Sequence, residues 1–162
     1  MNIQSQRFGA VEFADDALLT FPRGVIGFPR EQKFVLIPHK TSSYLAWLQS
    51  VTTPELAFPV VSAHAFGTDY SDLSFVEATK VAAVGGPPEE CAVMVVLCAP
   101  QAQPATVNLL APVVVNLQTR QGAQVILEDS RYSTREPFVV VQSPERMPIA
   151  EPSAPELASS AV

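Results

Sequence analysis

The sequence is short of positive charge and of long apolar runs. Ten lysine and arginine residues stand against 16 aspartate and glutamate residues, so the net charge is −6. Because binding to nucleic acid depends on neutralising phosphates, we expect no direct binding to RNA or DNA, whereas a basic protein partner fits this charge. No apolar run approaches the ~18 residues of a membrane span, and the first residues carry no apolar signal core. We therefore expect a cytoplasmic protein with no membrane contact.

Cysteine is also scarce. The two cysteines both lie in the apolar run Cys91–Cys98. If that run is a strand, the spacing places the two sulfurs on opposite faces and about 23 Å apart, beyond the reach of a disulfide. The sequence predicts two buried thiols in a reducing compartment, with a metal or redox role as the alternative.

Patterns typical of catalysis or metal binding are missing. His39 and His64 have no second ligand at zinc spacing, no serine sits in a nucleophile elbow, and no glycine-rich loop opens a helix. The adjacent carboxylates Asp15-Asp16 and Glu89-Glu90 fall in turns, where neighbouring side chains point apart. We expect a protein that is not an enzyme and that holds no cofactor or metal.

What the chain does have is a series of short segments rich in valine, isoleucine and leucine, which favour strands. The central pair, Val113–Leu117 and Ala123–Leu127, flanks a turn in which Gly122 is expected to supply the positive φ of a bulged hairpin. Pro112 cannot donate to a central ladder, so we expect it at a strand start or a bulge. Further strands are expected at Arg7–Phe13 and Ala17–Thr20 (an N-terminal hairpin), Phe34–Ile37, Tyr44–Val51, Leu56–Val61, Cys91–Cys98 and Thr106–Leu110.

Three segments qualify this pattern. Tyr44–Val51 is apolar on both faces, which means burial on both sides or one side that meets a partner. Pro59 inside Leu56–Val61 indicates an edge strand or a bulge. One short helix is expected from about Phe75 to Val84, ended by two glycines and two prolines.

Many short strands and one brief helix predict a mainly β domain, a small antiparallel β-barrel-like fold over residues 1–140. Residues 141–162 are rich in proline, alanine, serine and glutamate. This composition lacks the apolar density for a core and predicts a disordered tail.

The segment Thr20–Pro29 combines strongly apolar residues with two prolines and two glycines. Such a segment forms a structured loop, and no ladder can bury all of its apolar side chains. The loop therefore supplies our candidate partner-binding residues Arg23, Val25, Ile26 and Phe28. The alternative is that Phe21 and Phe28 close an open end of the barrel.

The middle of the chain is acidic. Strictly between Lys40 and Arg120 the only basic residue is Lys80, against six acidic residues: Glu55, Asp69, Asp72, Glu77, Glu89 and Glu90. One interpretation is ordinary solubility. The other is an acidic face that attracts a basic partner and repels a polyanion such as RNA, for which Glu89 and Glu90 are candidates.

Several sequence blocks occur together in the order and spacing of a known family. They are TFPRGVIGF (20–28), FVLIP (34–38), WLQSVTTPELAF (47–58), TVNLLAPVVVN with TRQGAQVIL (106–127) and SRYSTREP (130–137). On these blocks the chain resembles the flagellar assembly factor FliW family from about Phe8 to Pro137. Pro59 and the long tail after Phe138 depart from the family pattern.

The resemblance implies a β-barrel-like, non-enzymatic cytoplasmic protein that binds flagellin and CsrA, the RNA-binding translational repressor. It further implies that export of flagellin releases the factor to bind CsrA and relieve repression of flagellin translation. Asn108, Asn116 and Arg120 match the family blocks and join the partner-binding candidates, although they equally suit satisfying backbone groups in turns and strands. Two other readings stay open: a barrel that binds a small ligand in an internal apolar cavity, and a direct RNA-binding module.

Overall fold

The computed structural model describes residues 1–67, 70, 87–128 and 131–138. The expected helix around residues 75–84 and the expected tail at 141–162 lie outside these residues. The described strands are β1 (Asn2–Ser5), β2 (Gly9–Glu12), β3 (Leu19–Thr20), β4 (Lys33–Pro38), β5 (Leu45–Ser50), β6 (Ala57–Ser62), β7 (Cys91–Cys98), β8 (Thr106–Val107), β9 (Val113–Asn116), β10 (Gln121–Gln124) and β11 (Glu136–Pro137). Three short 3-10 helices accompany them, η1 (Asp15–Ala17), η2 (Ala63–Phe66) and η3 (Pro88–Glu90).

Seven strands close into a barrel. They follow the order β7-β6-β5-β4-β3-β10-β9, and β9 pairs back onto β7. This confirms the mainly β, barrel-like prediction. One neighbour pair departs from the expected antiparallel arrangement: β3 and β10 run parallel and meet through the single register pair Thr20↔Gln121. Because β3 has two residues and Pro22 follows it closely, the pairing extends no further.

The N-terminal hairpin forms from other residues than predicted. β1 pairs with β2 from Asn2↔Glu12 to Ser5↔Gly9, whereas Leu19–Thr20 pairs with β4 and β10. The Ser5 hydroxyl accepts hydrogen bonds from the amides of Arg7 and Phe8, which closes the turn before Gly9 at φ +72°. The predicted pairing of 7–13 with 17–20 was therefore wrong. The turn between β1 and β2 is made by a serine hydroxyl in a polar stretch, and such a stretch lacks the alternation of apolar residues by which a strand is predicted.

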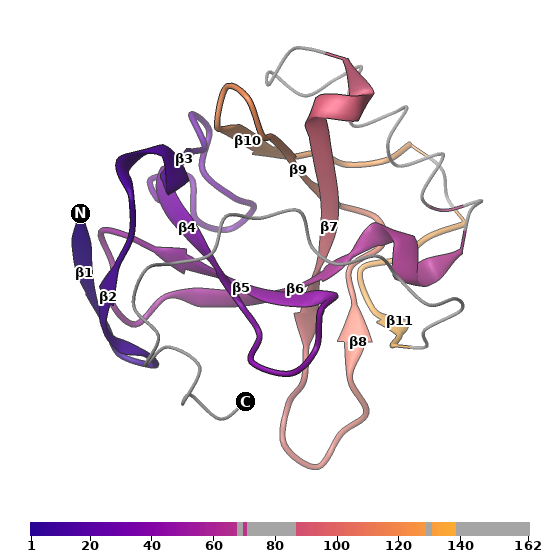
Figure 1. The fold of residues 1–162 in the computed structure, drawn as a ribbon. Helices are drawn as coiled ribbons and strands as arrows, with labels where there is room; N and C mark the ends of the chain where they lie inside the picture. Colours follow the sequence, from indigo (N-terminus) through magenta and orange to yellow (C-terminus); the bar gives the residue numbers. More distant parts are fainter. Residues whose placement is uncertain (68–69, 71–86, 129–130, 139–162) are drawn as a thin grey trace.

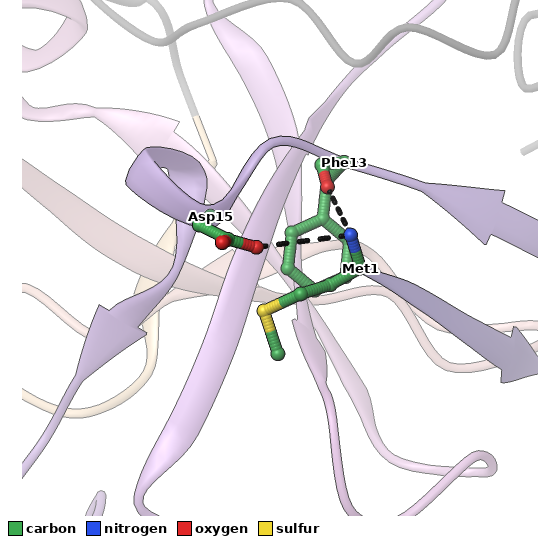
Figure 2. Close-up of polar contacts among 3 residues, drawn as sticks. All are labelled: Met1, Phe13 and Asp15. Carbon is green, nitrogen blue, oxygen red and sulfur yellow. Dashed lines mark hydrogen bonds and ion pairs between the residues drawn. The ribbon is translucent and has the colours of Figure 1, made fainter.

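The N-terminal ammonium group fastens the start of this hairpin (Figure 2). It donates a hydrogen bond of 2.9 Å to the Phe13 carbonyl and lies 3.8 Å from the Asp15 carboxylate. Asp15 belongs to η1, so the contact links the first residue to the segment that leads into the barrel.

Side chains on alternate strand positions divide into an interior and two outer layers. The interior cluster includes Leu19, Phe21, Phe34, Leu36, Leu48, Val60, Met94, Val113 and Val115. One outer cluster packs Val35, Ile37 and Trp47 against β1 and β2, and the other packs Val93, Val95 and Val114 against Val107, Leu109 and Tyr70. Figure 1 shows β1 and β2 on one side of the barrel and β8 and β11 on the opposite side. β5 is thus buried on both faces, which accounts for the apolar character of Tyr44–Val51.

The central hairpin forms with its first strand as predicted, but its second strand, β10, spans Gln121–Gln124 instead of Ala123–Leu127, so the turn is shorter than expected. β9 and β10 pair from Val113↔Gln124 to Asn116↔Gln121, and Pro112 directly precedes β9 as expected. The positive φ belongs to Arg120 at +59°, so its assignment to Gly122 was wrong. Gly122 is required for another reason, because a Cβ there would lie 2.5 Å from the Phe21 ring in the barrel interior.

Two further expectations need correction. For Pro59 an edge strand or a bulge was expected. β6 is a strand of the barrel wall between β5 and β7, with an unbroken register on both sides, so neither alternative holds. Its register with β7 begins at Val60, which leaves Pro59 without a β7 residue opposite it and explains how the proline is tolerated. Cys91 and Cys98 are both unbridged thiols, but only Cys91 is buried; Cys98, the last residue of β7, is exposed.

Candidate functional site

The loop that follows β3 is a small rigid structure. Val25 and Phe28 form an isolated β-bridge, with amide-to-carbonyl distances of 3.3 and 2.8 Å. Gly24 and Gly27 have φ values of +66° and +89°, which side-chain-bearing residues rarely adopt. A Cβ on Gly24 would also overlap the Phe28 carbonyl and the Pro29 backbone. The backbone therefore fixes where the side chains of this loop point.

The four candidate residues of the loop differ in exposure. Val25 is buried with Phe21 in the barrel interior, so these two residues plug the barrel. Arg23 is exposed, and Ile26 and Phe28 keep 52% and 41% of their surface accessible. The Phe28 ring packs edge-on against Phe58 at 5.5 Å and still faces solvent. The partner-binding prediction is thus compatible with Arg23, Ile26 and Phe28. Val25 is buried beneath them and anchors the loop in the barrel interior.

Gln124 connects this loop to the barrel, and no local pattern in the sequence indicates this contact. Its side-chain oxygen accepts a hydrogen bond of 2.9 Å from the Ile26 amide, and its nitrogen donates one of 3.0 Å to the Ala111 carbonyl. The glutamine lies in β10, 98 residues from Ile26. A polar residue in a strand gives no periodic signal for such a distant contact.

One end of the barrel opens beneath the loop into a hollow of about 140 Å³. We call it the mouth. Its lining consists of Val25, Ile26, Leu48, Phe58, Val96, Asn108, Val113 and Gln124. Pockets that hold small ligands usually enclose roughly 300–1,000 Å³. The mouth is smaller than that and ends at the packed interior cluster, so it is not the internal apolar cavity that the small-ligand interpretation requires.

A second hollow, of about 350 Å³, runs between the loop and β10. We call it the groove. It is lined by Pro22, Arg23, Gly24, Val25, Ile26, Gly27 and Pro29 on one wall and by Gly122, Ala123, Gln124 and Val125 on the other. Arg23 is the charged residue of this lining, and Ile26 lines both the groove and the mouth.

The other candidates gather at the far end of β9 and β10. We call Glu89, Glu90, Asn116 and Arg120 the turn surface. The side-chain nitrogen of Asn116 donates a hydrogen bond of 3.3 Å to the Glu90 carboxylate, and the backbone amide of Arg120 donates one of 2.8 Å to the Asn116 backbone carbonyl. Asn116 is fully buried, and its side-chain oxygen accepts from the amides of Gln118 and Thr119. It supports the turn, while Glu89 is exposed above it.

The nine candidate residues thus form two surfaces. Val113, at the start of β9, lines the mouth, and Asn116 ends the same strand at the turn surface. Three steps of about 3.3 Å separate these residues by about 10 Å. Asn108 belongs to the mouth, where its side-chain oxygen accepts from the Ala111 amide at 3.0 Å and so also shapes a turn.

Two titratable groups near these surfaces are shifted by their surroundings. Burial raises the pKa of the Cys91 thiol, and the neighbouring Glu90 charge adds to the effect. Hydrogen bonds from the hydroxyls of Ser50 and Thr53 lower the pKa of Glu31, which follows the loop in the chain. Within the described ranges no group of three or more His, Cys, Asp or Glu residues could hold a metal ion. In the same part of the chain, no helix is long and apolar enough to cross a membrane.

Known proteins share this sequence and fold. The family described as "FliW protein" matches residues 2–138. The flagellar assembly factor FliW of Heliobacterium modesticaldum is 37% identical over 135 residues, which cover 83% of this chain and 88% of that protein. The one from Magnetococcus marinus is 36% identical over 143 residues, with 86% and 85% covered. A crystal structure of the flagellar assembly factor FliW matches with a TM-score of 0.70 at 29% identity, covering 85% of this chain and 96% of that one.

Proposed function

This chain belongs to the FliW family of flagellar assembly factors, and from that premise we propose that it binds flagellin and antagonises the translational repressor CsrA by direct protein–protein contact in the cytoplasm. While flagellin occupies the factor, CsrA represses flagellin translation. Export of flagellin releases the factor, which then binds CsrA and relieves the repression. The protein acts by occupancy and carries out no chemical reaction.

The observation that carries this proposal is the exposure of large apolar side chains around the mouth. Ile26 and Phe28 are 52% and 41% exposed, and Ile126 is 63% exposed. Strand alternation places Ile126 on the same face as Gln124, which lines the mouth. Among the described residues, the other large apolar side chain that is mainly exposed is Met1, at the start of β1, and most of the remaining apolar side chains pack into the interior and the two outer clusters. Grouped exposed apolar residues on a fixed loop are typical of a surface that a protein partner covers.

The turn surface supports the second contact. Glu89 is exposed and Glu90 is partly exposed beside it, on a chain with net charge −6. An RNA-binding protein presents a basic surface, which these carboxylates attract. A factor docked there also repels the phosphates of RNA, so electrostatics contribute to the antagonism.

The short distance between the two surfaces supports exclusive occupancy. A standard interface covers about 800 Å² on each partner, which is a patch roughly 30 Å across. Mouth and turn surface are separated by the four residues of β9, about 10 Å. Two partners of ordinary size would overlap there, which favours a switch over simultaneous binding.

The test is a titration of the full chain with flagellin and with CsrA, separately and together. We expect each partner to bind alone and each to displace the other. Ile26→Asp should weaken flagellin binding, and Glu89→Lys with Glu90→Lys should weaken CsrA binding and its release from RNA. Glu55→Lys, an exposed charge reversal outside both surfaces, is the matched control. A stable ternary complex, or no binding of either partner, contradicts the proposal.

A further inference from the structure

The barrel has an open strand edge beside the loop. β3 meets β10 at the pair Thr20↔Gln121, and no strand of the described chain pairs with the rest of β10 on that side. The amides of Val125 and Leu127 donate to Pro112 and Leu110, so these two residues point their backbone groups toward the β9 side. Alternation along a strand then directs the N–H and C=O groups of Gln124 and Ile126 the opposite way.

Gln124 lines the groove, and Ile126 follows its last lining residue, Val125, so these outward groups lie along and just beyond the groove without a backbone partner. Gln124 lies opposite Val113 at a non-hydrogen-bonded position of the β9–β10 ladder, because the next amide, that of Val125, bonds to Pro112. Outside the strand ladders, no backbone hydrogen bond among the described residues involves Gln124 or Ile126. An unpaired edge of this kind is a template for a further strand, and proteins use such edges to capture extended segments of their partners. The groove, of about 350 Å³, provides room beside Gly122–Val125.

The opposite wall of the groove is preformed. The Val25–Phe28 bridge and the positive φ of Gly24 hold the loop in one conformation, and the Ile26–Gln124 hydrogen bond fixes its distance from β10. The loop therefore does not have to become ordered when a segment binds in the groove, and this lowers the entropic cost of binding.

Charge indicates what kind of segment fits. Arg23 lines the groove, is exposed, and has no ion pair or hydrogen bond among the described residues. Its guanidinium suits a carboxylate, while Ile26 in the groove lining and the exposed Ile126, next to the lining residue Val125, suit apolar side chains. CsrA binds RNA and must present a basic surface, which Arg23 repels. Flagellin is the partner that remains.

We propose that the groove takes an extended segment of flagellin, which adds as a strand to the open edge of β10 and places an acidic side chain against Arg23. This inference rests on the proposed function in one respect, because it assigns flagellin to this end of the barrel and leaves the turn surface to CsrA.

Amide hydrogen exchange of the full chain, followed by NMR with and without flagellin, tests the strand addition. We expect exchange at Gln124 and Ile126 to slow at least tenfold on binding, while Val125 and Leu127, already paired toward β9, change little. Flagellin binding without this alternating protection overturns the inference and leaves the proposed function standing. Protection already present in the chain alone, and lost when residues 142–162 are removed, also overturns it, because the occupant is then the chain's own tail.

A probe peptide separates the groove from the identity of the partner. The probe is a seven-residue peptide of alternating valine and threonine with a central glutamate, and its twin carries lysine at the centre. We expect the glutamate peptide to protect Gln124 and Ile126 and to bind about tenfold more tightly than the lysine peptide, the size of one charge-assisted hydrogen bond. Arg23→Glu should reverse that preference, and Arg30→Glu, an exposed reversal on the same loop outside the groove lining, should not.

The two failures are distinguishable. If the peptides show the alternating protection and the charge reversal while flagellin does not bind, the groove is a strand-capture site and the proposed function is wrong. If neither peptide protects Gln124 and Ile126 and the preference does not follow Arg23, the groove is not such a site, whatever flagellin does.

Discussion

Replacing Gly122 with alanine tests the packing that closes the barrel. Gly122 lies in β10 with its α-carbon against Phe21, whose ring is fully buried and packs edge-on against Phe34 at 5.3 Å. An added Cβ would lie 2.5–2.8 Å from three atoms of the Phe21 ring, closer than real Cβ contacts come. The ring cannot retreat without displacing the interior cluster, so Gly122→Ala forces strain into the seam between β3 and β10.

The expected loss follows from two opposing terms. Overpacking a filled core costs about 1–3 kcal/mol. Replacing glycine by alanine also stiffens the unfolded chain, which returns about 0.4–1 kcal/mol. The free energy of unfolding should therefore fall by about 1–2 kcal/mol, measured by urea denaturation followed by far-UV circular dichroism and tryptophan fluorescence from Trp47.

A double-mutant cycle identifies the cause. Phe21→Leu alone should cost about 1–2 kcal/mol through lost packing. In the Gly122→Ala background it removes the clashing ring atoms, so the double variant should be at least about 1 kcal/mol more stable than the sum of the single losses predicts. Gly27→Ala, which introduces backbone strain but meets no atom within 4 Å, is the control and should show no such coupling. Additive losses at Gly122 and Phe21, or an unchanged stability of Gly122→Ala, would refute the reasoning.

Other positions give sharp expectations. In the folded protein Cys98 should react with a thiol reagent at pH 8 at least tenfold faster than Cys91, which is buried and has a raised pKa; equal rates contradict the assignment. Because the pKa of Glu31 is lowered in the fold, its stabilising effect should be complete above the unfolded value of 4.5 and disappear as pH falls through the lowered pKa. Its replacement by glutamine should remove that pH dependence, which denaturation at pH 3–7 measures, at a cost below about 1 kcal/mol because the carboxylate is largely solvated. Gln49→Ala should cost about 2–4 kcal/mol in denaturation experiments, since the buried amide contacts one serine hydroxyl and three carbonyls. Gly24→Ala should weaken flagellin binding, measured by titration, more than Gly27→Ala, because only the former collides with the loop backbone.

The sequence was sufficient for the elements whose pattern is local. β7 falls where the apolar run Cys91–Cys98 predicts it, and the expected strand Phe34–Ile37 becomes β4. The sequence was insufficient where a polar side chain decides the backbone. Ser5 makes the first hairpin turn through its hydroxyl, in a stretch without apolar periodicity. The role of Gly122 could not be predicted for a different reason: its close approach to Phe21 joins positions about one hundred residues apart.

The candidate site followed the same division. Exposure of Ile26 and Phe28 could be inferred, because a loop of prolines and glycines cannot bury every apolar residue that it carries. The grouping of Asn108 with the loop, and of Asn116 with Glu90, depends on how the barrel closes. Nothing in the local sequence indicates that closure, because a single parallel pair provides it.

The pair Thr20↔Gln121 has a consequence for the order in which the chain folds during its synthesis. It joins positions about one hundred residues apart, so the chain can form β4, β5 and β6 as two neighbouring hairpins long before the barrel closes. Contacts between such distant positions form slowly, because the chain loses the entropy of loop closure before the burial of apolar surface stabilises the contact. On the ribosome, the groove cannot exist until the last strand of the barrel has emerged. A nascent or truncated chain that ends before β10 therefore lacks the groove, and if the groove takes a partner strand as we propose, binding there reports that the barrel has been completely synthesised.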